Sequence, residues 1–239
     1  MASLSNQSDE AQTTTPAQMR YIVKVLETKM LTHNVRHFVV QKPPGYTFVS
    51  GQATDISINK PGQEEELRPF TFTSVNTSEQ LEFIIKIYTG HDGLTEKLGR
   101  INAGDELILH EVFGTIRYKG PGLFLAGGAG ITPFISIFRQ LKSNHKLNGN
   151  TLLFANRTAD DIILGGELKD LLSDNYLDVL EISDDPKRPG RFIDRALLTE
   201  YVNRKDQYYY ICGPDKFVSI MVATLLDLGV HRSFIIIEE

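Results

Sequence analysis

A glycine-rich turn at residues 127–133, Gly-Gly-Ala-Gly-Ile-Thr-Pro, constrains the fold of this chain more than any other stretch. The apolar run 123–126 before it is typical of a buried strand. After it, apolar residues recur at i, i+3, i+4 and i+7 from Phe134, which predicts a helix with one buried face. We expect Thr132 to cap this helix and Pro133 to open it. The N–H groups at such a helix start suit an anion, most naturally a pyrophosphate.

The turn differs from the common dinucleotide fingerprint Gly-x-Gly-x-x-Gly, because Pro133 stands where that pattern ends in glycine. A glycine turn between a strand and a helix can also be purely structural. The turn by itself therefore leaves two interpretations, a nucleotide site and a plain structural turn.

The composition narrows the classes of protein to consider. The chain has 239 residues, of which 41% are hydrophobic and 23% charged, as in an ordinary globular protein of one large or two small domains. A net charge of −5 gives no reason to expect nucleic acid as a partner. The single cysteine, Cys212, excludes an intramolecular disulfide and a four-cysteine iron–sulfur cluster within the chain. We therefore expect a cytoplasmic protein.

Neither a metal site nor a membrane span is predicted. The histidines form no Cys/His cluster at metal-ligand spacing. No apolar run approaches the roughly 20 residues that a membrane helix needs. Residues 1–19 are rich in serine, threonine and glutamine, so we expect a disordered tail there and no secretory signal.

The stretch 20–118 predicts a domain made of short strands. Its β-rich runs are separated by clusters of turn residues, and one helix is expected at 95–99. Six strands with a single helix indicate a closed or nearly closed antiparallel barrel. The strands are expected at 21–26, 35–40, 52–58, 69–74, 81–88 and 106–112.

The stretch 119–239 predicts an α/β domain with a five-stranded parallel sheet, because strands alternate with helices. Ligands of such sheets bind beyond the carboxyl ends of the strands. The segments 127–133, 156–157 and 212–214 each follow a predicted strand, so we expect them to meet at one edge. The strands are expected at 122–126, 151–155, 177–182, 207–212 and 233–237, and the helices at 133–142, 164–172, 194–203 and 215–228.

Three motifs, in this order along the chain, resemble those of the ferredoxin–NADP reductase superfamily. Arg68-Pro-Phe-Thr71 resembles its flavin motif Arg-x-Tyr-(Ser/Thr), although from composition alone this stretch would be an ordinary strand. Residues 127–133 resemble its nucleotide loop Gly-Gly-x-Gly-x-x-Pro, and Cys212-Gly-Pro214 resembles its Cys-Gly-Pro motif. The resemblance covers the chain from about residue 20 to the end. Residues 153–158 resemble the second strand of the nucleotide domain in the cytochrome b5 reductase branch of this superfamily.

The resemblance implies that the barrel binds a flavin, FAD rather than FMN. Arg68 would bind the flavin phosphate and Phe70 would lie against the ring. Thr71 would hydrogen-bond near N5, the flavin atom that accepts hydride. The further flavin-binding residues that the resemblance implies are Pro69, Ser74, Ile85, Lys86, Ile87, Gly93, Leu94 and Thr95.

The resemblance also implies that the second domain binds NADPH or NADH. Cys212 would lie near the nicotinamide C4, and it would form the catalytic pair with Thr71 without acting as a nucleophile. Arg157 would meet the 2′-phosphate of NADPH, which favours NADPH, although Asp160 and Asp161 oppose it. The further nucleotide-binding residues implied are Gly128, Gly130, Thr132, Pro133, Gly213 and Pro214.

The sequence departs from the family pattern at three places. Phe70 lacks the hydroxyl of the usual tyrosine, so we expect weaker flavin binding. Ala129 replaces a residue that is often polar in relatives. The sequence ends at Glu238-Glu239 without an aromatic residue to cover the flavin, so we expect the nicotinamide approach to be open.

The predicted function is that of a monomeric NAD(P)H-dependent flavoprotein reductase. It would pass hydride to bound FAD and then electrons to a separate ferredoxin, flavodoxin or haem protein. One alternative is an enzyme that reduces flavin as a diffusible substrate, which Phe70 favours. The other is a non-catalytic electron-transfer subunit of a larger complex, whose known relatives carry a C-terminal cysteine cluster that is absent here.

Overall fold

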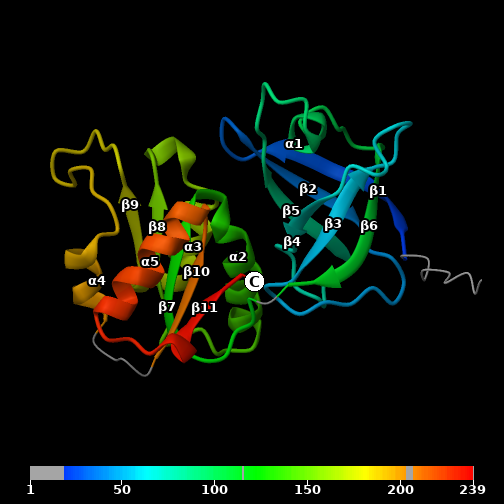
Figure 1. Cartoon of the computed structure of the whole chain (residues 1–239). Coiled ribbons are helices and arrows are strands. Elements are labelled where there is room, and N and C mark those ends of the chain that lie inside the picture. Colours follow the sequence, from blue (N-terminus) through cyan, green and yellow to red (C-terminus); the bar gives the residue numbers. More distant parts are fainter. Residues whose placement is uncertain (1–18, 115, 203–206, 239) are drawn as a thin grey trace, which may run out of the picture.

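Two lobes lie side by side in the computed structural model, which describes residues 19–114, 116–202 and 207–238 (Figure 1). The first lobe contains a six-stranded antiparallel sheet and the second a five-stranded parallel sheet. This arrangement confirms the predicted fold class. The predicted disordered tail lies outside the described residues, except for Met19.

The first lobe is a barrel that is nearly closed. Its sheet has the strand order β4-β3-β6-β1-β2-β5. Beyond β4, Phe72 and Phe83 form a bridge that brings the two edge strands together. Along the strands, buried side chains such as Val23 alternate with exposed ones such as Ile22, as the two faces of a sheet require. The elements of this lobe are β1 (Tyr21–Met30), β2 (Val35–Gln41), β3 (Ala53–Ile58), β4 (Arg68–Thr71), β5 (Gln80–Lys86), α1 (Leu94–Leu98) and β6 (Glu106–Phe113).

The second lobe is a parallel sheet with helices on both faces and the strand order β11-β10-β7-β8-β9. The three central strands are therefore β10, β7 and β8, whose carboxyl ends are neighbours. The strands are β7 (Gly122–Gly127), β8 (Thr151–Asn156), β9 (Tyr176–Leu180), β10 (Tyr208–Cys212) and β11 (Ile235–Ile237). The helices are α2 (Thr132–Ser143), α3 (Gly165–Leu172), α4 (Arg195–Tyr201) and α5 (Asp215–Asp227).

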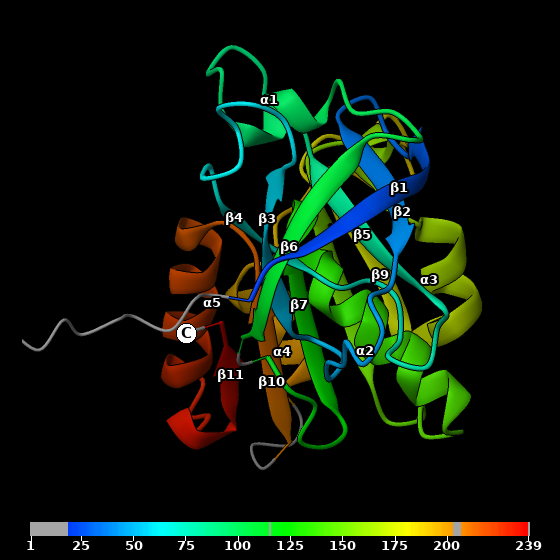
Figure 2. The same cartoon turned by 90° about the vertical axis from the view of Figure 1, so that its right-hand side faces the viewer.

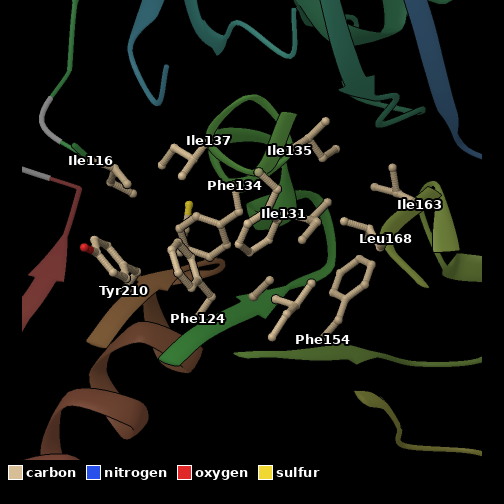
Figure 3. Packing of buried hydrophobic residues seen from close by; sticks show 14 of the residues in the cluster. Ile116, Phe124, Ile131, Phe134, Ile135, Ile137, Phe154, Ile163, Leu168 and Tyr210 are labelled. Atoms are coloured by element: carbon tan, nitrogen blue, oxygen red, sulfur yellow. The ribbon is translucent and has the colours of Figure 1, made fainter. Parts of the chain in front are cut away.

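Strand β7 is buried along its whole length, because helices cover both faces of the sheet. Phe124 packs in the cluster on the side of α2 and α3, where Figure 3 shows its ring between those of Phe134 and Tyr210. The ring centroids of Phe124 and Phe134 are 5.0 Å apart, and those of Phe124 and Tyr210 are 4.2 Å apart. Leu123 and Leu125 pack on the other side, against α4 and α5.

Some local predictions are wrong at element ends. Thr132 does not cap α2 but is already helical, with φ −57° and ψ −45°, because the 3₁₀ turn η1 (Gly128–Ile131) precedes it. The predicted strand 81–88 ends at Lys86 (β5), and the predicted strand 69–74 is reduced to β4, Arg68–Thr71. The last residue of the predicted helix 194–203 lies outside the described residues.

The two lobes share a hydrophobic cluster. Val35 and Ile84 of the barrel pack in the same cluster as Ile131 and Ile135 of the second lobe. Polar contacts reinforce this junction, since the Gly51 N–H donates to the Ser136 hydroxyl at 3.1 Å. Figure 2 shows α2 beneath the barrel strands. This helix contributes Ile135 and Ser136 to the junction.

Candidate functional site

The glycine turn predicted to bind a nucleotide lies at the carboxyl end of β7. Gly128 has a φ of +51°, a left-handed conformation that favours glycine, and a Cβ placed there would meet no atom within 4 Å. Gly130 is required for a different reason, because a Cβ there would overlap the backbone of Cys212. The Thr132 hydroxyl donates to the Ala129 carbonyl at 3.0 Å and so braces the turn.

Loops from neighbouring strands meet beside this turn, as the sequence predicts. Gly127–Ala129 after β7, Asn156 and Arg157 at the end of β8, and Pro214 after β10 line one cleft of about 230 Å³. The barrel forms the opposite wall with Asn34, Val35 and Lys86. The cleft therefore lies between the two lobes, where parallel sheets place their ligands.

The charges in this cleft favour an anion with a nearby hydroxyl-bearing group. Lys86, Arg157 and Arg191 line it together with Asp161 and Glu181. Within the part of the chain that the structure describes, neither Arg157 nor Arg191 has an ion-pair partner within 4 Å. Arginine forks hold phosphate in a bidentate manner, and carboxylates accept hydrogen bonds from ribose.

Asn156 is a residue to which sequence reasoning gave no role. It is the last residue of β8, lines the cleft and is only 8% exposed. Neither atom of its side-chain amide has a hydrogen-bond partner among the described residues. A buried amide without partners costs free energy, so a polar ligand in this cleft would satisfy it.

Cys212 ends β10 and faces the end of the chain. Its thiol lies 3.9 Å from a carboxylate oxygen of Glu238, a partner that the sequence motifs did not indicate. Burial, followed by the charge of Glu238, raises the pKa of this thiol to about 12. The thiol is therefore protonated near neutral pH and is not a nucleophile, in agreement with the sequence analysis.

The predicted flavin strand, β4, is an edge of the barrel sheet and pairs only with β3 within the described residues. Arg68 and Pro69 are exposed, while Phe70 and Thr71 are half-buried. The Arg68 guanidinium donates to the Leu67 carbonyl at 2.8 Å. No other hydrogen bond of this guanidinium is found among the described residues, so its remaining donors can meet an anion.

Ser74 differs from the other residues predicted on this segment. It is only 1% exposed, and its hydroxyl accepts a hydrogen bond from the Glu82 N–H at 3.0 Å. The structure thus gives Ser74 a place inside the barrel wall, and its predicted flavin contact stays a prediction.

The remaining predicted flavin residues lie on β5 and at the start of α1. Ile85 and Leu94 are buried, so only their backbones are candidates for contact, whereas Lys86 and Ile87 are half-buried. The Glu96 carboxylate accepts hydrogen bonds from the N–H groups of residues 90–92. The Leu94 N–H bonds to the Glu66 carboxylate, whereas the N–H groups of Gly93 and Thr95 have no partner among the described residues.

The residues of both lobes fit the cofactors that the sequence predicts. On the nucleotide side, the fit rests on the unpartnered Asn156 amide, the open space over Gly128 and the cations of the cleft. On the flavin side, it rests on the exposed Arg68, the half-buried Phe70 face and the N–H groups of Gly93 and Thr95, which are unpaired among the described residues. A Cβ on Gly93 would meet nothing within 4 Å.

Comparison with known protein families matches each lobe to one domain. The model of the FAD-binding domain matches residues 20–111, and the model of the oxidoreductase NAD-binding domain matches residues 124–223. The chain belongs to the ferredoxin–NADP reductase superfamily. It therefore carries an FAD-binding and an NAD-binding domain, and the predicted cofactors are confirmed at that level.

Curated relatives include two kinds of reductase. The chain is 29% identical over 214 residues to the reductase component of propane 2-monooxygenase from Rhodococcus jostii, covering 83% of this chain. It spans only 57% of the length of that relative. It is also 29% identical over 226 residues to NADH–cytochrome b5 reductase 1 of Arabidopsis thaliana, covering 86% of this chain and 79% of the relative.

A solved structure supports the same arrangement of lobes. The chain superposes on the CS–b5R domains of human Ncb5or in the NAD⁺ form with a TM-score of 0.80 and 25% identity, over 92% of this chain and 70% of that one. Among the described residues, no helix is long and apolar enough to cross a membrane. The same residues contain no group of three or more His, Cys, Asp or Glu side chains that could hold a metal ion.

Proposed function

We propose that this chain is an NAD(P)H-dependent flavoprotein reductase that transfers hydride to bound FAD and then passes electrons to a separate redox protein. The observation that carries the proposal is the cleft between the lobes, in which three loops of the nucleotide sheet face residues of the barrel. Bound FAD would supply a hydride acceptor that gives up its electrons one at a time. The relatives support a separate acceptor, because one is an oxygenase reductase component and another a cytochrome b5 reductase.

The chain's own residues would bind and orient the two cofactors. Arg68 and the N–H groups of Gly93 and Thr95 would hold the flavin phosphates, while Phe70 and Thr71 would contact the ring. Gly128, the turn that follows it and Pro214 would shape the floor under the nicotinamide nucleotide. Hydride transfer needs two rings held at short range in a site that excludes water, and no acid or base is required from the protein.

We propose a ferredoxin, a flavodoxin or a small haem protein as the electron acceptor. A direct test uses purified protein passed through a desalting column and then supplied with NAD(P)H and a soluble one-electron acceptor. The proposal predicts that the protein stays yellow and reduces the acceptor in proportion to its concentration. A yellow protein that oxidises neither NADH nor NADPH would support a non-catalytic electron-transfer subunit instead.

The second candidate function is reduction of flavin as a diffusible substrate. The observation in its favour is that Phe70 replaces the usual tyrosine on a strand whose neighbours Arg68 and Pro69 are exposed. This enzyme would lose its colour on the desalting column. It would then oxidise NAD(P)H only when free flavin is added, which distinguishes it from the first candidate.

We propose NADPH as the preferred donor, because Arg157 lies at the cleft with Lys86 and Arg191. The opposing charges are Asp161 and Glu181. The substitution Arg157→Ala should raise the Michaelis constant for NADPH by about 10-fold and that for NADH by less than 2-fold, since a charge-assisted contact to phosphate is lost. Equal changes for the two donors would reject the assignment.

Other features of the molecule remain proposals of the same kind. We place the flavin domain at 20–118 and the nucleotide domain at 119–239, supported by the change from antiparallel to parallel pairing between β6 and β7. We propose a monomer located in the cytoplasm, and the single cysteine in the chain supports the location. Sedimentation of the purified protein tests the monomer.

A further inference from the structure

Helix α2 joins the nucleotide turn to the barrel. Its first residues, Thr132 and Pro133, continue the glycine turn, and Arg139 follows about two helical turns later. The Arg139 guanidinium contacts the barrel through Nη1. This nitrogen donates to the Thr73 carbonyl at 2.9 Å and to the Glu82 carboxylate at 3.0 Å. Thr73 lies only two residues beyond Thr71, the last residue of β4.

The other edge of the guanidinium is fixed within the nucleotide lobe. Its Nε and Nη2 donate to the two carboxylate oxygens of Glu167 on α3, at 2.6 and 2.9 Å. This bidentate pairing holds the plane of the guanidinium, so that Nη1 presents a fixed donor to the barrel. The Arg139 side chain is 24% exposed, which limits screening of these contacts by water.

A second contact from α2 leads to the same part of the barrel. The Ser136 hydroxyl accepts the Gly51 N–H at 3.1 Å and donates to the Pro133 carbonyl at 3.1 Å. Gln52, which follows Gly51, accepts the Phe72 N–H at its carbonyl oxygen at 3.1 Å. Both contacts of α2 therefore converge on the segment Phe72–Thr73, directly after the predicted flavin motif.

The barrel partner of Arg139 keeps its negative charge. Glu82 lies on β5, where its carboxylate also contacts the His37 ring at 3.1 Å. The hydrogen bond from His37, together with the charge of Arg139, lowers the pKa of Glu82 to about 2 against the opposing effect of burial. The pair with Arg139 is therefore ionised throughout the physiological range.

We propose that Arg139 is a positioning residue that fixes the nucleotide turn at a set distance from the flavin strand. This inference rests on the proposed function, because the distance matters only where hydride passes between the two lobes. Near-attack geometry requires reacting atoms about 3–3.5 Å apart, and a displacement of 1 Å costs roughly 100-fold in rate. The side chain touches neither cofactor site directly, so it acts through the placement of α2 and β4.

The proposal separates binding from reaction. Removal of the Arg139 contacts leaves Arg68, Phe70, Gly128 and Arg157 in place, so both cofactors should still bind. The two cofactor sites should, however, no longer be held at a fixed relative position. We therefore expect the rate of flavin reduction at saturating NAD(P)H to fall, with little change in the dissociation constant of either cofactor.

The test compares Arg139→Gln with Arg195→Gln in the FAD-loaded protein. Arg195 pairs with Asp227 on the nucleotide lobe and has no contact with the barrel among the described residues, so it controls for loss of an arginine ion pair. Stopped-flow reduction should slow about 10-fold or more in Arg139→Gln and less than 2-fold in Arg195→Gln. Arg139→Lys, which keeps the charge and can donate to Thr73, should recover part of the rate.

Amide hydrogen exchange in the absence of NAD(P)H gives a readout that does not depend on turnover. The Thr73 N–H donates to the Glu82 carbonyl, and the Glu82 N–H donates to the Ser74 hydroxyl. Both N–H groups should exchange faster in Arg139→Gln but not in Arg195→Gln. If Arg139→Gln does not fold, Ser136→Ala replaces it and should slow reduction about 3-fold.

The outcomes distinguish the positioning role of Arg139 from the proposed reductase function. Reduction of Arg139→Gln at the wild-type rate, or a loss explained entirely by weaker cofactor binding, would overturn the positioning role. A wild-type protein that keeps its FAD but is not reduced by NADH or NADPH would overturn the proposed function. In that case the exchange measurement would still show whether Arg139 couples the lobes.

Discussion

The two proposed cofactor sites are built in opposite ways. The nucleotide turn after β7 is held by packed backbone on both sides, since β7 and the first half of α2 are buried and Gly130 packs against the backbone of Cys212. The flavin strand β4 is an exposed edge of four residues, and its ligand-binding groups are side chains on the surface. The nucleotide turn is shaped by its backbone, whereas the flavin strand offers side chains.

This difference determines how each site should respond to substitution. Changes in a tightly packed backbone turn alter the fold and the binding of a ligand together, because close packing transmits strain. Changes on an exposed edge strand alter binding with little effect on the fold. The substitutions below test this contrast, from the largest expected effect to the smallest.

The substitution Gly130→Ala should have the largest effect. The new Cβ would overlap the Cys212 carbonyl, and the two loops would have to separate. We expect stability to fall by about 3 kcal/mol and NAD(P)H affinity by roughly 100-fold, measured by urea unfolding and by titration. Gly166→Ala on α3 is the matched control, because nothing lies within 4 Å of its Cβ and its stability should be unchanged or slightly higher. Similar losses for both variants would contradict the packing argument.

The substitution Arg68→Ala should weaken FAD binding and leave the stability of the fold nearly unchanged. Its guanidinium bonds only to the Leu67 carbonyl among the described residues, so we expect urea unfolding of the FAD-free protein to change by less than about 0.5 kcal/mol. The dissociation constant for FAD should rise by about 10- to 100-fold, as expected for loss of charge-assisted bonds to phosphate. Lys24→Ala, at an exposed site on β1, should leave FAD binding unchanged. A large loss of stability in Arg68→Ala would remove the contrast between the two sites.

The stability contributed by Glu82, which links the barrel to the nucleotide lobe, should depend on pH. The pKa of Glu82 is lowered from 4.5 to about 2 in the folded protein, so its ionised form stabilises the fold above pH 4.5. That stabilisation, about 3 kcal/mol, should be lost as the pH falls from about 5 to 2. Urea unfolding at a series of pH values should show this loss in the wild type and a smaller one in Glu82→Gln. Identical slopes would exclude Glu82 as the source.

The substitution Phe70→Tyr should have the smallest effect, and a favourable one. It restores the hydroxyl that the family motif carries, on a half-buried residue of an edge strand. We expect FAD to bind about 5-fold more tightly, as one added hydrogen bond allows, with no change in unfolding. Fluorescence titration with FAD measures the gain. Weaker binding in the tyrosine variant would argue that Phe70 does not face the flavin.

Periodicity predicted most of the fold because its signals are local. The apolar run before the turn and the helical spacing after it indicated β7 and α2, and the short β-rich runs indicated the barrel. The errors fall at element ends, where tertiary hydrogen bonds decide. Residues 128–131 form a 3₁₀ turn, so that Thr132 is inside the helix rather than at its cap.

Long-range contacts were beyond the reach of the sequence. No pattern along the chain pairs Arg139 with Thr73 and Glu167, or Cys212 with Glu238, because these residues are far apart in sequence. The motifs did indicate which loops would meet, since neighbouring parallel strands end at one edge. They placed Asn156 at this edge but gave its side chain no role, because that role depends on burial without a partner among the described residues. The roles of individual site residues therefore remain predictions.

The most direct test of the central claim is an anaerobic absorbance titration of the desalted, FAD-loaded protein with NADPH and then with NADH. If the two cofactors meet in the cleft between the lobes, the yellow flavin absorbance should disappear with one equivalent of donor per flavin. Absorbance that persists with both donors in excess, in a folded protein that binds them, would contradict the account.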